Sequence, residues 1–172
     1  LSHIQETDEY VPVQHGLYFY YTRTEAGKQY PIYCRKQAKS RAQLSATPEE
    51  IILDVNALAE GKSFLSVTVT KPSPDHSKLA YLQNETGTDR YTLYIKDLVT
   101  GNLLPEYIEN VFIGGSLEWA SDDYLFYVTV DEKQRPYQLF RHRLGERNDT
   151  LIFEETDEAF YLHVFKSDSA AY

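Results

Sequence analysis

The sequence is poor in the residues that build metal centres and disulfide-bonded folds. Among its 172 residues there is one Cys, one Trp and no Met. A single cysteine excludes an internal disulfide, and Cys34 lies in the apolar stretch 31–34 (PIYC), so we expect a buried, inert thiol rather than a reactive one. Because a natural translation product begins with Met, we expect a processed chain or, more readily, a piece excised from a longer one.

Long apolar runs and an excess of basic residues are also missing. The longest apolar runs, such as residues 124–130, are too short to span a bilayer, and no signal-peptide core stands at the start. We therefore expect no membrane partner and a cytoplasmic protein, with the periplasm left open. A net charge of −9 argues against nucleic acid as a partner and indicates a solvated acidic surface, the alternative being a preference for cationic partners.

Aromatic residues are abundant, at 14% of the chain, and Tyr alone contributes 15 residues. Three Tyr residues are each followed ten positions later by a second Tyr, and the three segments align without a gap: Tyr20 with Tyr30, Tyr81 with Tyr91, and Tyr127 with Tyr137. Such self-similarity indicates a repeat architecture, and aromatic and β-branched residues favour strands.

The repeat predicts an all-β fold, a partial β-propeller of about three four-stranded blades plus the start of a fourth. The whole of 1–172 is then a fragment of one propeller domain. We place a lead-in at 1–10 and the four blades at about 11–61, 62–109, 110–156 and 157–172. Strands are expected at 11–13, 17–24, 31–34, 49–54, 64–70, 79–83, 91–97, 111–113, 117–119, 124–130, 137–142, 150–154 and 161–165, with a helical turn at 55–60 and a loop at 37–48.

Catalytic and cofactor chemistry finds little support in the sequence. The segment 114–118 (GGSLE) departs from the nucleophile pattern G-x-S-x-G at Glu118, so Ser116 is read as part of a turn or bulge. The histidines are His3, His15, His76, His142 and His163, and no two of them have metal-ligand spacing. We therefore predict no catalytic, cofactor-binding or metal-binding residue in the chain, and no cofactor.

The acidic and aromatic residues can also be explained by structural roles, without a binding function. Asp122 and Asp123 lack the alternating ligands of a calcium loop and are read as a polar turn before the strand at 124–130. The acidic run at 154–158 is read as a solvated loop, with a docking surface for basic peptides as the alternative. Without interleaved basic residues, Trp119 and the Tyr and Phe residues are read as packing between blades rather than as a base-stacking platform.

Several ordered motifs resemble the opening of the propeller domain in the oligopeptidase B group of the prolyl oligopeptidase family of serine peptidases. They are 6–8 (ETD), 11–13 (VPV), 16–24 (GLYFYYTRT) and 27–35 (GKQYPIYCR), then 73–75 (SPD), 125–127 (LFY) and 153–157 (FEETD). The likeness covers nearly the whole chain. It fails at 37–48, where no family motif matches.

The resemblance implies a seven-bladed propeller over an α/β-hydrolase domain that carries a Ser-Asp-His triad and selects Lys or Arg in short peptides. None of those catalytic positions falls within 1–172, so the chain itself is expected to be inactive. Its partners would be the hydrolase domain of the same chain and, through it, the peptide substrate, while the propeller limits access of large substrates. The hairpin loops 24–28, 86–90 and 131–136 are expected on one face by repeat geometry.

Two other functions stay open on sequence alone. One is a stand-alone propeller scaffold for protein or peptide partners, and the other is a small β-sandwich that binds carbohydrate through Tyr and Trp. The spacing of 46 residues between Tyr81 and Tyr127 speaks against the sandwich. A partial propeller leaves unpaired edges, so self-association or marginal stability is expected of the isolated chain.

Overall fold

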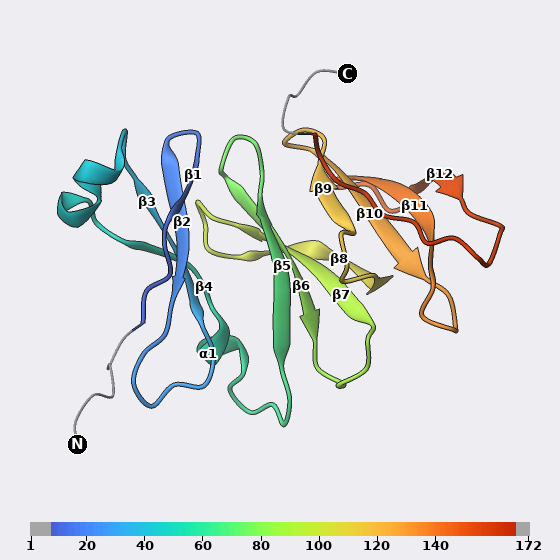
Figure 1. Ribbon diagram of the computed structural model, residues 1–172, viewed down its shortest axis with the longest axis horizontal. Coiled ribbons are helices and arrows are strands. Elements are labelled where there is room, and N and C mark those ends of the chain that lie inside the picture. Colours follow the sequence, from blue (N-terminus) through green and yellow to red (C-terminus); the bar gives the residue numbers. More distant parts are fainter. Residues whose placement is uncertain (1–7, 168–172) are drawn as a thin grey trace. The chain divides into compact units, whose positions relative to one another are not determined.

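The computed structural model describes residues 8–167, which divide into two compact units, one ending at Ser63 and the other beginning at Phe64. In the first unit four antiparallel strands follow one another in order, β1 (Val13–His15), β2 (Tyr18–Arg23), β3 (Ile32–Gln37) and β4 (Glu50–Asp54) (Figure 1). A 3₁₀ helix, η1 (Arg41–Ala46), lies between β3 and β4, and one helical turn, α1 (Val55–Leu58), follows β4.

The second unit holds eight strands. The first four are β5 (Ser66–Pro72), β6 (Lys78–Asn84), β7 (Tyr91–Asp97) and β8 (Leu103–Val111), paired antiparallel in sequence order. The next four are β9 (Leu117–Trp119), β10 (Tyr124–Val130), β11 (Pro136–Arg143) and β12 (Thr150–Glu154), paired in the same manner. A single residue pair, Val111 with Thr129, joins β8 to β10.

Within residues 8–167 the twelve strands form one four-stranded and one eight-stranded antiparallel sheet, which confirms the all-β class expected from the repeat. The strands at 91–97, 117–119, 124–130 and 150–154 have the predicted bounds. The strand expected at 64–70 instead begins at Ser66 and includes Pro72, so the turn that follows starts at Ser73.

Four expectations about secondary structure were wrong. The first strand is β1 at Val13–His15 rather than at 11–13. Strand β8 was missed, because Pro105 and an exposed, polar alternation hide it, and Val111 is its last residue rather than the start of a later strand. The stretch 37–48 is not simply a loop, since η1 occupies Arg41–Ala46. Residues 161–165 form no strand; instead the Leu162 and Val164 N–H groups donate to the carbonyls of Pro136 and Gly115.

The second unit has one large apolar core, built from both of its sets of strands. Its fully buried members share inward-facing positions on β6 to β10: Ala80, Leu82, Leu93, Ile95, Val111, Leu117, Trp119, Leu125 and Tyr127. Trp119 is therefore a core residue, as expected from the sequence. In the first unit a smaller cluster of Tyr21, Ile32 and Cys34 is buried between β2 and β3.

The aromatic rings pack mainly across neighbouring strands of one sheet, which refines the expectation of packing between blades. Tyr81, Tyr94 and Tyr107 stack in a row over β6, β7 and β8, with centroid distances of 6.0 and 6.2 Å. Tyr127 stacks on Phe140 of β11 at 5.5 Å. Such cross-strand pairs fix the register of a sheet.

Equivalent turns of the two sets of strands in the second unit contact each other directly. The Asp75 N–H donates to the Asp122 carboxylate at 2.8 Å, and the Trp119 indole N–H donates to the Lys71 carbonyl at 2.9 Å. Lys71 also pairs with Glu118 at 2.6 Å. These contacts join residues 47 or 48 positions apart, close to the repeat spacing, so they tie one repeat to the next.

Candidate functional site

The residues that might have supplied a nucleophile are buried. Ser116 has no exposed surface, and its hydroxyl has no hydrogen-bond partner within the part of the chain that is described. Cys34 is free and buried, as expected, and burial, reinforced by the nearby Glu49, raises the pKa of its thiol to about 12. Both groups are therefore poor nucleophiles at neutral pH.

The histidines are dispersed. His15 lies on β1 against the Tyr20 ring, His163 Nδ1 donates to the Gly114 carbonyl at 2.7 Å, and His142 is buried in β11. His3 lies outside the described residues. Across residues 8–167 no group of three or more His, Cys, Asp or Glu side chains could hold a metal ion. No helix in that range is long and apolar enough to cross a bilayer.

The predicted hairpin loops are folded around short polar side chains. In 86–90, the Asn84 side chain accepts from the N–H groups of Thr86 and Gly87. In 131–136, the Asp131 carboxylate accepts from the N–H groups of Lys133 and Arg135. Their common placement on one face stays a prediction.

The acidic run after β12 is largely exposed, as expected of a solvated loop, and two cations of the hairpin loop 131–136 contact it. The Arg135 guanidinium donates to the carbonyls of Glu155, Asp157 and Phe160. Lys133 pairs with Glu158 at 3.1 Å, with both side chains 74% exposed. Asp122 and Asp123 likewise form the expected polar turn before β10, where the Asp123 N–H donates to the Ser121 hydroxyl.

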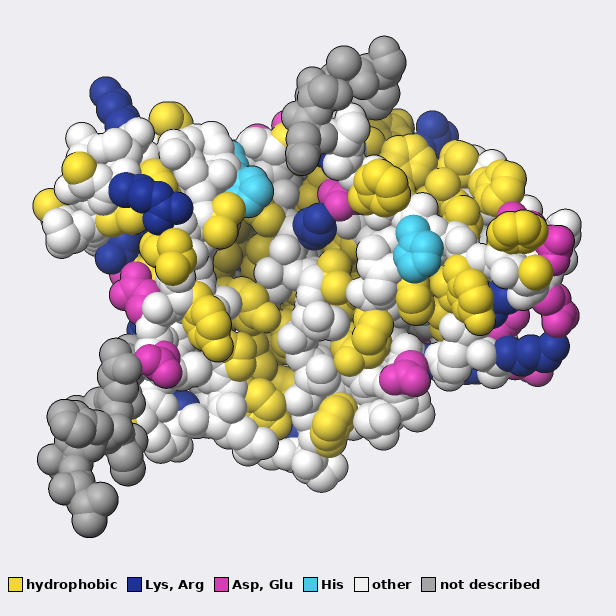
Figure 2. All heavy atoms as spheres, viewed as in Figure 1, with side chains coloured by type: hydrophobic (Ala, Val, Ile, Leu, Met, Phe, Trp, Pro, Cys, Tyr) yellow, Lys and Arg dark blue, Asp and Glu magenta, His cyan; other side chains and the backbone are white. Residues whose placement is uncertain are grey.

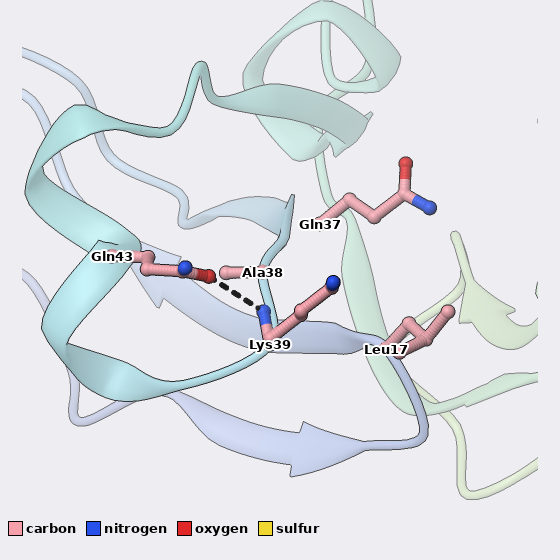
Figure 3. Close-up of a pocket in the computed structure, with 5 residues that line it drawn as sticks. All are labelled: Leu17, Gln37, Ala38, Lys39 and Gln43. Carbon is pink, nitrogen blue, oxygen red and sulfur yellow. Dashed lines mark hydrogen bonds between the residues drawn. The ribbon is translucent and has the colours of Figure 1, made fainter.

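One hollow lies in the first unit, next to η1. It has a volume of about 330 Å³ and is lined by Leu17, Gln37, Ala38, Lys39 and Gln43 (Figure 3). The Gln43 amide oxygen accepts from the Lys39 N–H at 3.0 Å and closes the turn that leads into η1. With one ammonium and two amides, this lining can offer hydrogen bonds but no acid–base pair.

A second hollow, of about 650 Å³, lies in the second unit beside the middle of β8. Its wall carries the buried cluster that we call the His142 cluster, made of Tyr127, His142, Asp149 and Glu106. His142 Nδ1 lies 2.7 Å from one Asp149 oxygen, and the Tyr127 hydroxyl donates to the other at 2.5 Å. Burial and the Asp149 carboxylate raise the pKa of Tyr127, so its phenol stays protonated at neutral pH.

The far side of the same imidazole faces β8. His142 Nε2 is 3.8 Å from a Glu106 oxygen, and that oxygen accepts from the Gly145 N–H at 3.1 Å. The His142 side chain is only 3% exposed, and Nε2 is buried without a hydrogen-bond partner in the described structure. Glu146 and Arg147 complete the charged lining of the hollow.

Sequence reasoning considered His142 only as a metal ligand and missed this cluster. Its carboxylates come from positions 106 and 149, in a strand that was not predicted and in a turn. A signal was nevertheless present in the repeat. Arg35, Lys96 and His142 each stand five residues after the second Tyr of their repeat, so a basic side chain recurs at one structural position.

The face drawn in Figure 2 shows no basic patch among the described residues. On the face drawn in Figure 2, Lys and Arg side chains are scattered among hydrophobic and acidic ones rather than gathered in one area. Large hydrophobic side chains are exposed on β12, where Leu151, Ile152 and Phe153 are each nearly half exposed.

Comparisons with known proteins agree on one relationship. The family model described as "Prolyl oligopeptidase, N-terminal beta-propeller domain" matches residues 1–172. Protease 2 of Moraxella lacunata is 55% identical over all of this chain and 25% of its own length, and dipeptidyl aminopeptidase BI of Pseudoxanthomonas mexicana is 33% identical over 97% of this chain and 25% of its own. The chain thus spans about a quarter of these curated relatives.

A solved structure gives the same answer in three dimensions. Oligopeptidase B from Leishmania major superposes with a TM-score of 0.86 at 34% identity, over 96% of this chain and 23% of that one. The resemblance inferred from the ordered sequence motifs is confirmed, and so is the propeller class of the fold.

Proposed function

Because this chain belongs to the prolyl oligopeptidase family and matches its N-terminal β-propeller domain throughout, we propose that it is the access-limiting part of a serine oligopeptidase of the oligopeptidase B type. The observation that carries the proposal is the 55% identity to Protease 2 of Moraxella lacunata over the whole chain. The substrates would be short peptides cleaved after Lys or Arg. The cleaving serine and its partners would lie on an α/β-hydrolase domain beyond these residues.

The properties of the chain suit a scaffold that shields a reaction. Its only thiol is buried and Ser116 is buried. In the hairpin loops 86–90 and 131–136, the Asn84 and Asp131 side chains bind N–H groups of the loop backbone. A rigid propeller built from such sheets can exclude a folded protein by size while admitting an extended peptide. We propose a cytoplasmic location for the enzyme, to be checked by cell fractionation against periplasmic markers.

The test begins with the coding sequence that flanks this chain. We expect the reading frame to continue into further repeats and then into a G-x-S-x-G serine with downstream Asp and His. The encoded protein should cleave short peptides after Lys or Arg, and replacement of that serine by Ala should abolish cleavage. A stop codon soon after Tyr172, or a full-length product without peptidase activity, would instead favour the stand-alone scaffold that binds protein or peptide partners.

A further inference from the structure

The protonation state of His142 follows from its neighbours. The Asp149 carboxylate already accepts one hydrogen bond, from Tyr127, and its second oxygen lies 2.7 Å from His142 Nδ1. A carboxylate can only accept, so Nδ1 must be the donor, and the neutral imidazole then carries its one proton there. Nε2 is left as a bare lone pair.

That lone pair faces another acceptor. The Glu106 oxygen is 3.8 Å from Nε2, too far for a hydrogen bond and close enough for a strong charge interaction, since both side chains are largely buried. With neutral His142 the two acceptors oppose each other across this gap. A proton on Nε2 would turn the mismatch into an ion pair and supply the missing donor.

The repeat shows what this position does elsewhere in the chain. Arg35, the counterpart of His142 in the first repeat, is buried and pairs with Glu50 on the adjacent strand at 2.7 Å. Asp149 stands just before the β12 residue that pairs with Arg141, so it faces His142 much as Glu50 faces Arg35. The third repeat therefore keeps the acidic partner but replaces a permanent cation by a titratable one.

We propose that His142 is a proton-operated clasp between the second and third repeats. With Nε2 protonated, the imidazolium holds Glu106 of β8 and Asp149 beside β12 at the same time. When Nε2 is deprotonated, the ion pair with Glu106 is lost, and His142 no longer links the third repeat to β8. Few backbone contacts join β8 to β10, where the second repeat meets the third. They are one residue pair, Val111 with Thr129, and one adjacent hydrogen bond from the Phe112 N–H to the Val128 carbonyl.

Besides His142, the cluster and the charged lining of the hollow hold one phenol, one guanidinium and three carboxylates among the described residues. Burial and the Asp149 carboxylate raise the pKa of Tyr127, so its phenol stays protonated at neutral pH. The guanidinium is that of Arg147, and the carboxylates are those of Glu106, Glu146 and Asp149. Among these side-chain types imidazole is the one that serves as a switch near neutral pH, so we assign the switching proton to His142. The clasp does not depend on the proposed peptidase activity.

The decisive variant is Glu106→Gln, which removes the charge yet keeps an oxygen for the Gly145 N–H. At about pH 5.5 we expect the unfolding equilibrium constant, from urea titration, to rise about tenfold relative to wild type, because the ion pair is gone. At pH 8.0 we expect no rise, or a fall, because the Gln amide can donate to bare Nε2. Glu146→Gln, on the same hollow, is the matched control and should show the same small effect at both pH values.

A change of equal size at both pH values in Glu106→Gln would overturn the proposal. So would persistence of the pH-dependent difference when Glu106→Gln is made in a His142→Gln background. A second measurement needs no variant: long-range ¹H–¹⁵N spectra of wild type should show Nδ1 protonated and Nε2 bare at pH 8.0, and both protonated at pH 5.5. An Nε2–H tautomer at pH 8.0, or an imidazole that does not titrate in this interval, would contradict the clasp.

Discussion

Burial sets the chemistry of the single thiol. Cys34 is fully buried on β3, and burial, with Glu49 nearby, raises its pKa to about 12. At pH 8 the native thiol is both hidden and protonated, so we expect Ellman's reagent to modify it at less than about a hundredth of the rate seen in urea. Equal rates in the native and unfolded chains would show that Cys34 is accessible.

The carboxyl group of Asp75 leads to a prediction about the stability of the protein at acidic pH. Burial alone would raise the pKa of its carboxyl, but hydrogen bonds from Ser73 and Ser77 outweigh burial and hold that pKa at about 2. A carboxyl whose folded pKa is depressed adds stability above its unfolded pKa and loses it as the pH falls. We therefore expect Asp75→Asn to be less stable than wild type at pH 6 and to lose less stability between about pH 4 and 2.

The check is urea unfolding at pH 6, 4 and 2. Asp131→Asn, in a hairpin loop, serves as the comparison, because hydrogen bonds to the Arg135 and Lys133 N–H groups also lower the pKa of Asp131. Parallel pH profiles for wild type and Asp75→Asn would contradict the assignment for Asp75.

Trp119 is the side chain that joins β9 to the preceding repeat. It is buried in the main core and donates to the Lys71 carbonyl at 2.9 Å. We expect Trp119→Ala to cost about 3–5 kcal/mol in the free energy of unfolding and Trp119→Phe about 1–2 kcal/mol, from lost packing and the lost hydrogen bond. Circular dichroism during urea unfolding measures both.

The control is Phe165→Ala, at a side chain that is 80% exposed, for which we expect a change within about 0.5 kcal/mol. If Trp119→Ala lowered the free energy of unfolding as little as the control does, Trp119 would not be a stabilising contact between the repeats.

At the scale of elements, the sequence predicts those strands whose apolar residues have a clear period. The strands β7 and β10 have the expected bounds, because turn residues bracket a short run of aromatic and β-branched side chains. Strand β8 escaped prediction because Pro105 and its polar, exposed alternation resemble a loop, and only pairing with β7 makes it a strand. The His142 cluster needed that strand, so it could not be assembled from local patterns.

Strand β12 presents an exposed edge that bears on association. Leu151, Ile152 and Phe153 are 46%, 46% and 48% exposed, and β12 lies at the end of its sheet. Such an edge can pair with another chain. We expect concentration-dependent self-association of the isolated chain in sedimentation velocity, and a reduction of it in Phe153→Lys.

Val99→Lys, in the turn after β7, is the matched control, because Val99 is 83% exposed but lies away from any sheet edge. Association that is equal in both variants, or a monomeric wild type at high concentration, would show that β12 is not the contact.

At the scale of the molecule, the Tyr repeat, the all-β sheets and the family match all indicate a β-propeller domain. The fold class was accessible from sequence because the Tyr spacing recurs three times, while the blade boundaries remain predictions. The chain spans 25% of Protease 2 of Moraxella lacunata, and the role that we propose for it requires a catalytic domain outside these residues. The central claim is therefore about access.

The most direct test of that claim compares one Arg-containing cleavage sequence in two settings, using the longer protein that the proposal expects the gene to encode. In the first it is a free short peptide, and in the second it is an exposed loop of a small, stable folded protein. The account predicts efficient cleavage of the peptide and cleavage of the folded protein at less than about a hundredth of that kcat/KM, because the proposed role of the propeller is to admit extended chains and exclude folded ones. Equal cleavage of both substrates would contradict the account.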